Sequence, residues 1–246
     1  APVVSDGAIS LSGANGTGGA FIIGDTVTAA WDVSGADGDT NLSSTLGSVT
    51  VDFSAFGGGA NVAASLAGTT WSATYQIVAN TSTTGSNLNV SLTATDEAGN
   101  TATTADTTNA TVDATPPNVT AANIAFSGAS GTGGAYKIGD TVTATWDNTA
   151  AGDNNAGITA VTIDFTAFGG AAAVVASESS GTWSATHTIV AGAIDAANLN
   201  ISVSATETSG NATTTAGTDN ATVDNIAPTV TAANISVSGA TGNPNN

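Results

Sequence analysis

The sequence predicts an all-β protein in which one β-sandwich is repeated along the chain. The phrase "GGAFIIGDTVTAAWD" at residues 18–32 returns as "GGAYKIGDTVTATWD" at residues 133–147, and such self-similarity indicates a repeat architecture. Apolar residues alternate with Ser, Thr and Asp, as in Val49, Val51 and Phe53, which is the two-residue period of a half-buried strand. Glycine-rich stretches separate these segments about every 8–12 residues, as expected of a sandwich.

The repeat runs through the whole chain. "APVVSDGAISLSGANG" from Ala1 matches "PPNVTAANIAFSGASG" from Pro116 and "APTVTAANISVSGATG" from Ala227. Near the ends of the copies, "NATVD" from Asn109 matches "NATVD" from Asn220. The offset is 115 residues at the starts (1 to 116) and 111 at the ends (109 to 220), so the copies differ by small loop insertions or deletions.

These matches predict two domains, 1–115 and 116–226. Residues 227–246 are expected to be the first strand of a third repeat, either truncated or exchanged between subunits. The linkers "ATPPN" and "NIAPT" are short and stiffened by proline, so we expect the domains to form an extended array.

Each copy is expected to contain about seven strands, because each apolar alternation ends at a turn signal. "TWSATYQI" places Trp71, Ala73, Tyr75 and Ile77 on one face. In the first copy the expected strands are 3–12, 20–32, 47–56, 60–67, 69–78, 87–96 and 102–113. About seven strands in about 110 residues is the size of an immunoglobulin-like sandwich. The chain has no Cys, so packing alone must hold such a core.

The two last strands and the linker carry a family resemblance. "TATDEAGN" (93–100) followed by "NATVDATPPNVT" (109–120) is similar to the Ig-like repeats of large bacterial cell-surface adhesins and surface-layer-type proteins. The second copy reads "SATETSGN" (204–211) and "NATVDNIAPTVT" (220–231), with Glu207 in place of the aspartate. The resemblance implies an extracellular structural or adhesive role, in arrays that calcium often stiffens.

Composition excludes several classes of partner. The net charge is −18, with 19 acidic residues and a single basic one, Lys137. Nucleic-acid phosphates and anionic membranes both attract Lys and Arg, so neither is an expected partner. No apolar run reaches the roughly 18 residues that a transmembrane helix needs, so no membrane span is expected in this segment.

An enzyme is not expected. The one histidine, His187, falls in the inward register of its strand, which indicates packing, and Tyr75 occupies its place in the first copy. With no Cys, a nucleophile would have to be built from Ser or Thr and carboxylates, and no cleft-forming insertion accompanies them. Trp71 and Trp183 share the inward register as well, which favours a core position over a sugar platform.

The acidic residues give the candidate site. They recur between copies as Asp25/Asp140, Asp32/Asp147, Asp52/Asp164, Asp96/Glu207 and Asp113/Asp224. In an Ig-like sandwich, Asp113 would face Asp153 and Glu207 across the linker that contains Asn118. Hard oxygen ligands of this kind suit Ca²⁺, and clustered carboxylates repel each other without a cation. We therefore predict a calcium site at Asp113, Asn118, Asp153 and Glu207, with solvated surface acids as the alternative.

Together these observations predict a non-enzymatic structural repeat segment of an extracellular cell-surface protein, as an adhesin extender, surface layer or filament. Its partners would be neighbouring repeats or subunits. The alternative is an Ig-like module that binds a surface glycan or a protein. Ten Asn-x-Ser/Thr sequons permit N-glycosylation, but a polar strand face also reads this way.

Overall fold

The computed structural model describes residues 1–35, 39–41 and 45–239. These residues form an all-β fold with several sheets and short 3-10 turns, and they contain no α-helix. None of their helical turns is long and apolar enough to cross a membrane. The all-β prediction is confirmed.

The chain divides into two compact units. Unit 1 is Ala1–Thr120 with Asn148–Val161 and Ser204–Thr215, and unit 2 is Ala121–Asp147, Thr162–Val203 and Ala216–Asn246. The boundaries of the units do not coincide with those of the predicted domains, 1–115 and 116–226. That division therefore stays a prediction drawn from the sequence repeat.

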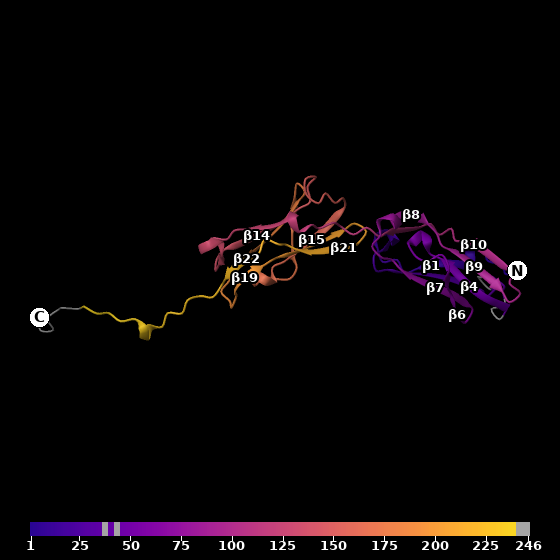
Figure 1. Cartoon of the computed structure of the whole chain (residues 1–246), viewed down its shortest axis with the longest axis horizontal. Coiled ribbons are helices and arrows are strands. Elements are labelled where there is room, and N and C mark those ends of the chain that lie inside the picture. The colour runs from indigo at the N-terminus through magenta and orange to yellow at the C-terminus, as the bar shows by residue number, and fades with distance from the viewer. Residues whose placement is uncertain (36–38, 42–44, 240–246) are drawn as a thin grey trace. The chain divides into compact units, whose positions relative to one another are not determined.

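The first copy forms three sheets in unit 1 (Figure 1). One has the order β1-β3-β7-β6: Ile9–Ser12, Thr26–Asp32, Thr70–Gln76 and Ser65–Ala67. The second has the order β10-β9-β4-β5: Thr101–Ala105, Ser91–Asp96, Leu46–Asp52 and Val62–Ala63. The third has the order β2-β11-β8: Phe21–Ile22, Ala110–Asp113 and Gly85–Leu88. Strands β2 and β11 pair in parallel, whereas the other pairs are antiparallel.

The second copy repeats this strand order sheet by sheet. The first sheet is β12-β14-β18-β17: Ile124–Ser127, Thr141–Asp147, Thr182–Thr188 and Ser177–Ser179. The second is β16-β15-β20-β21: Val174–Val175, Ile158–Asp164, Ser202–Glu207 and Ala212–Ala216. The third is β13-β22-β19: Tyr136–Lys137, Ala221–Asp224 and Asp195–Leu199.

Three of the 3-10 turns in the described residues recur at matching places in the two copies. They are Asp6–Ala8 with Ala121–Asn123, Thr17–Gly19 with Thr132–Gly134, and Ser54–Phe56 with Thr166–Phe168, whereas Thr81–Thr83 has no counterpart among the described residues of the second copy. The turn at Asp6–Ala8 precedes β1 just as the turn at Ala121–Asn123 precedes β12. Equivalent sequence thus gives equivalent local structure in both copies.

Several predicted strands are in fact two strands that lie in different sheets. The expected strand 20–32 is broken between β2 and β3, where Gly24 adopts a left-handed φ of 93°. Asp25 fixes this turn because its carboxylate accepts the N–H of Ile22 at 2.9 Å. The expected strand 87–96 is also divided, because β8 ends at Leu88 and β9 begins at Ser91 in a different sheet. The two-residue apolar period continues across these turns, so the pattern alone does not reveal them.

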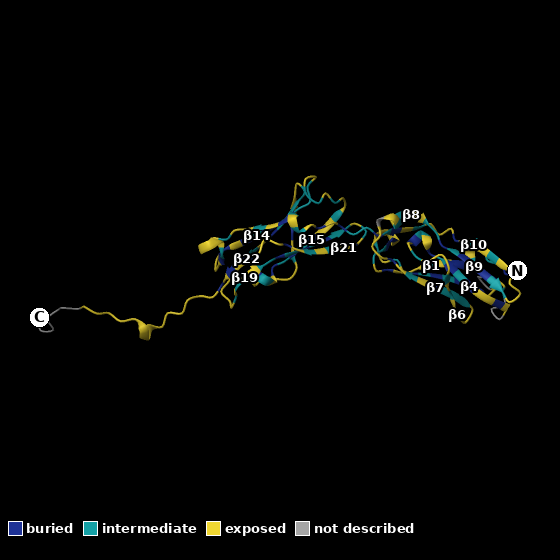
Figure 2. Ribbon diagram, viewed as in Figure 1, coloured by how far each residue is buried: buried dark blue, intermediate teal, exposed yellow. Residues whose placement is uncertain are grey.

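Alternating residues of the inner strands form the core of unit 1. Val27, Ala29 and Trp31 of β3 pack with Val51 of β4, and all four are fully buried. The core position of Trp31 agrees with its apolar register. Trp71, its cross-strand partner on β7, is only partly buried against the same core. Figure 2 shows the buried residues along these strands in dark blue.

The segment after β22 makes no strand in its described part, 225–239. Val230, Ile235 and Val237 are exposed, the last at 96%, and the segment is yellow in Figure 2. By contrast, Ile9 and Ile124, which match Ile235 in the repeat, are buried. The third-repeat strand therefore stays a prediction, because Val230, Ile235 and Val237 are exposed in the described part of the chain.

Candidate functional site

Two of the four predicted calcium ligands lie together. Asp153 accepts the N–H of Thr120 through Oδ2 at 2.8 Å and the Asn118 side-chain Nδ2 through Oδ1 at 3.3 Å. Asn155 adds a double clamp: its Oδ1 accepts the N–H of Asn118 and its Nδ2 donates to the carbonyl of Asn118, both at 2.7 Å. Asp153 and Asn155 therefore hold the backbone of residues 118–120, where the chain enters the second copy.

The other two predicted ligands are linked through a residue that sequence reasoning missed. Asn211, only 3% exposed, donates from Nδ2 to the carbonyl of Asp113 at 3.0 Å and to Oε1 of Glu207 at 2.9 Å. The side chain of Asp113 instead accepts the N–H of Thr115 at 3.1 Å. The signal that could have identified Asn211 is its recurrence: Asn100 ends "TDEAGN" as Asn211 ends "TETSGN".

Within unit 1 the predicted ligands thus form two groups: Asn118 donates directly to Asp153, whereas Asp113 and Glu207 are joined only through Asn211. Among the residues that the structure describes, no three or more His, Cys, Asp or Glu side chains form a group that could hold a metal ion. The calcium site at Asp113, Asn118, Asp153 and Glu207 stays a prediction. Calorimetric titration of the metal-free chain with calcium tests it directly.

The first copy has the same clamp at its own start. Asp39 accepts the N–H of Ser5 at 2.7 Å and also the Ser5 hydroxyl. Asn41 accepts the N–H of Val3 at 3.0 Å and donates to the carbonyl of Val3 at 2.5 Å. We name the pair Asp39–Asn41, with its equivalent Asp153–Asn155, the entry clamp. Asp39 is also buried, and the Trp31 indole Nε1 donates to it at 2.8 Å.

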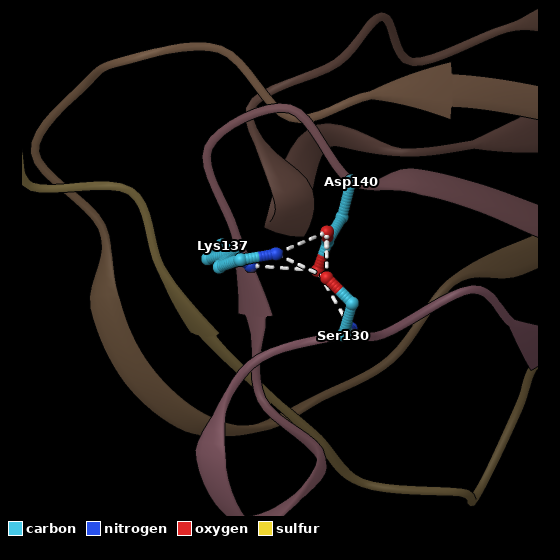
Figure 3. A network of polar contacts seen from close by, with 3 residues as sticks. All are labelled: Ser130, Lys137 and Asp140. Atoms are coloured by element: carbon cyan, nitrogen blue, oxygen red, sulfur yellow. Dashed lines mark hydrogen bonds and ion pairs between the residues drawn. The ribbon is translucent and has the colours of Figure 1, made fainter.

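A second polar cluster surrounds the only lysine (Figure 3). The Lys137 Nζ donates to Asp140 Oδ1 at 3.0 Å and also to the hydroxyl oxygen of Ser130, which in turn donates to Asp140 Oδ1 at 2.6 Å. The backbone N–H groups of Ser130 and Lys137 donate to Oδ2 at 2.9 and 3.1 Å. The Ser130 hydroxyl bond, followed by these backbone bonds, holds the pKa of Asp140 well below its usual range.

A serine beside a lysine can form a nucleophile–base pair, but the geometry here is that of a loop clamp. The Ser130 hydroxyl donates to a carboxylate, and the same carboxylate forms an ion pair with the ammonium group of Lys137. In the first copy Asn15 performs this task, donating to Asp25 from its N–H at 2.9 Å and from its Nδ2 at 2.7 Å. The shared feature is therefore the carboxylate that pins a glycine-rich loop to a turn.

The low pKa of Asp140 predicts how the stability of the fold changes with pH. A carboxyl whose folded pKa is depressed stabilises the fold above its unfolded value of about 3.9, and this stabilisation is lost as the pH falls. Asp140→Asn should therefore weaken the pH dependence of unfolding below about pH 4. Thermal melts across this pH range measure it, with Asp164→Asn as the control because Asp164 accepts the N–H of Thr166 in a local turn. Identical acid transitions in Asp140→Asn and the unsubstituted chain would contradict the prediction.

His187 packs as its register predicts. The half-buried ring lies tilted over Phe165, with ring centres 5.8 Å apart, and its Nε2 is 3.2 Å from the carbonyl oxygen of Phe168. The ring also covers Gly170, where an added Cβ would lie 2.9 Å from the His187 Nδ1. These contacts give the histidine a packing role.

The outer sheet faces are lined by hydroxyl groups. Thr50, Thr93 and Thr103 stand side by side on β4, β9 and β10, and the hydroxyl oxygens of Thr93 and Thr103 are 2.8 Å apart. In the second copy the hydroxyls of Ser204 and Thr214 lie 2.9 Å apart on β20 and β21. These faces therefore offer neutral hydrogen-bonding groups.

Each copy has a hollow of about 430 Å³ between the end of its first strand and its last strand. In the first copy Leu11, Phe21, Thr108 and Asn109 line it. In the second copy the matching residues are Phe126, Tyr136, Asp219 and Asn220. Burial, followed by the charges of Asp140 and Asp219, raises the pKa of the Tyr136 phenol. The second hollow is therefore the more aromatic and the more acidic of the two.

No protein-family model matches the chain, and no curated protein does. One solved structure with some similarity is that of the SGBP-B protein from the mixed-linkage glucan utilization locus of Bacteroides ovatus, in complex with a mixed-linkage heptasaccharide. It is 16% identical, the match covers 83% of this chain and 43% of that one, and the TM-score is 0.20. A TM-score this low carries no argument about fold or ligand.

Proposed function

We propose that this chain is a non-enzymatic structural repeat segment of an extracellular cell-surface protein, built from tandem Ig-like β-sandwiches. An adhesin stalk, a surface layer and a filament all use such segments. The neighbouring repeats or subunits of the same protein are its main partners. The family resemblance of "TATDEAGN" and "NATVDATPPNVT" supports the extracellular location.

The observation that carries this proposal is the entry clamp. Asp39 and Asn41 hold the backbone at Val3 and Ser5 in the first copy. Asp153 and Asn155 hold it at the matching residues of the second copy. A site devoted to a ligand needs to appear only once, whereas a device that fixes where the chain enters a module must be repeated in every module. The clamp therefore suits a chain that transmits tension or direction from one repeat to the next.

Force spectroscopy on the chain tests this role. Pulling from both ends should give two unfolding events of similar length, each releasing roughly 300–400 Å of chain if about 110 residues extend. Asn155→Ala removes the clamp bonds to Asn118 and should lower the force of one event only. Thr214→Ala, which changes an exposed hydroxyl pair on the sheet face, is the control. Unfolding of both copies at negligible force would count against a structural role.

The second candidate function is a glycan-binding module, and the hollow of the second copy favours it. Aromatic rings with a nearby carboxylate suit a sugar, since a ring packs on its apolar face and an acid accepts its hydroxyls. Tyr136 and Asp219 supply both groups, where the first copy has Phe21 and Thr108. Binding of soluble oligosaccharides should be lost when Phe126→Leu, Tyr136→Phe and Asp219→Thr together give this hollow the lining of the first.

A further inference from the structure

We propose that Asn109 and Asn220 are N-glycosylation sites, at which the side-chain Nδ2 carries a sugar beside the hollow of each copy. The two residues occupy the same place in the repeat, and each begins the sequence Asn-Ala-Thr. The chain contains ten such sequons, and sequence alone does not separate them. The structure distinguishes the sequons by whether the side-chain Nδ2 of the asparagine donates a hydrogen bond within the fold.

Six sequon asparagines use their Nδ2 to hold the fold. A sugar on such a nitrogen would replace a donated hydrogen or crowd its acceptor. Asn211 is the clearest case, because it is buried and its Nδ2 donates to the carbonyl of Asp113. The six are Asn15, Asn41, Asn89, Asn118, Asn200 and Asn211.

Asn109 and Asn220 are exposed and are held by their oxygen instead. Oδ1 of Asn109 accepts Nδ2 of Asn89 at 2.9 Å, and its N–H donates to Asn89 Oδ1 at 2.7 Å. Asn220 and Asn200 repeat this reciprocal pair at 2.9 and 2.8 Å. Both Asn109 and Asn220 adopt a left-handed φ of 58°. Among the described contacts neither Nδ2 donates a hydrogen bond, so the fixed side chain presents a free nitrogen.

The hollow beside each asparagine leaves room for a sugar. Asn109 and Asn220 each line a hollow of about 430 Å³, within the range of about 300–1,000 Å³ that small-molecule sites span. Phe21 in one copy and Tyr136 in the other lie at the side of the same hollow. Of the remaining sequons, Asn80 and Asn234 also have no Nδ2 bond among the described residues, but Gly192 and Asn123 stand at their matching positions, in sequences that are not sequons.

The chemistry balances without a redox step. Nδ2 attacks the anomeric carbon of a sugar carried on a lipid diphosphate, which an oligosaccharyltransferase supplies. The new C–N bond replaces the C–O bond to phosphate, the lipid diphosphate leaves, and the amide loses one proton to the transferase. Oδ1 is untouched, so the bonds from Asn89 and Asn200 survive. This inference relies on the proposed function only for export of the chain.

Mass spectrometry of the protein from the organism that makes it tests the proposal. Cleavage after aromatic and acidic residues is needed, because Lys137 is the single trypsin site. We expect the peptides containing Asn109 and Asn220 to carry glycan, and the peptide containing Asn211 to be unmodified. Thr111→Ala and Thr222→Ala should each remove one glycan, whereas Thr111→Ser should retain it. Absence of glycan from either asparagine, or glycan on Asn211 in folded protein, would overturn the inference.

The glycan readout is separate from the test of function. Force spectroscopy reports the mechanical role whether or not sugar is attached. A chain that resists force but carries no glycan at Asn109 and Asn220 would refute this inference alone. A glycosylated chain that offers no resistance to force would refute the structural role alone.

Discussion

Asp39→Ala is expected to lower the free energy of unfolding of unit 1 by about 3–5 kcal/mol. Asp39 is 6% exposed, and its carboxylate accepts the Trp31 indole N–H at 2.8 Å and the Ser5 N–H at 2.7 Å. Trp31 is itself fully buried, so the indole N–H would lose its partner in a place that water does not reach. A hydrogen bond to a charged group contributes about 1.5–3 kcal/mol, and this carboxylate makes several.

Denaturant unfolding followed by tryptophan fluorescence measures this loss. Asp32→Ala is the matched control, because among the described residues the Asp32 carboxylate accepts only from Ser34, from the Ser34 N–H at 2.8 Å and the Ser34 hydroxyl at 2.9 Å. In a Trp31→Phe background the Asp39→Ala change should cost less, because no indole N–H remains to be orphaned. A loss below about 0.5 kcal/mol, the range of ordinary surface substitutions, would show that the buried carboxylate is not essential.

Asp106→Ala is expected to act in the opposite direction and stabilise unit 1 by about 1–3 kcal/mol. Asp106 is 2% exposed, and its Oδ2 is buried with no hydrogen-bond partner among the described residues. In the described part of the chain, its Oδ1 accepts a hydrogen bond from the exposed hydroxyl of Thr108, at 2.8 Å. A buried polar atom without a partner keeps its full desolvation cost. The second copy has Gly217 at this position, so the fold does not require an acid there.

Thermal and denaturant melts of Asp106→Ala measure the gain. Asp106→Asn provides the control, because it keeps a polar atom at the Oδ2 position and should recover only part of the stability. Thr108→Ala separates the contribution of the partnered oxygen. If Asp106→Ala unfolds more readily than the unsubstituted chain, then Oδ2 has a stabilising interaction that the hydrogen-bond geometry does not account for.

The sequence by itself determined the all-β class and the repeat. The alternation at Val27, Ala29 and Trp31 is a local property of the chain, and those side chains are buried as the period requires. Recurrence of "IGDTVTA" in both copies leads to the same strand at Thr26–Asp32 and Thr141–Asp147. The alternation of apolar residues is visible within a few residues, and the repeat is visible by comparing the sequence with itself. Neither requires knowing which distant segments contact each other in the fold.

The tertiary structure alone decided where strands change sheets and what the acids do. The turn at Gly24 and Asp25 moves the chain from β2 to β3, although the apolar alternation predicts one strand across 20–32. Asp39 meets Ser5 across 34 residues of chain, and no local pattern encodes such a contact. Sequence showed that acids recur between the copies. Only the fold showed that Asp39, Asp140 and Asp153 accept hydrogen bonds from the N–H groups of nearby loops. A carboxylate can accept from any donor, so its partners depend on which segments the fold brings next to it.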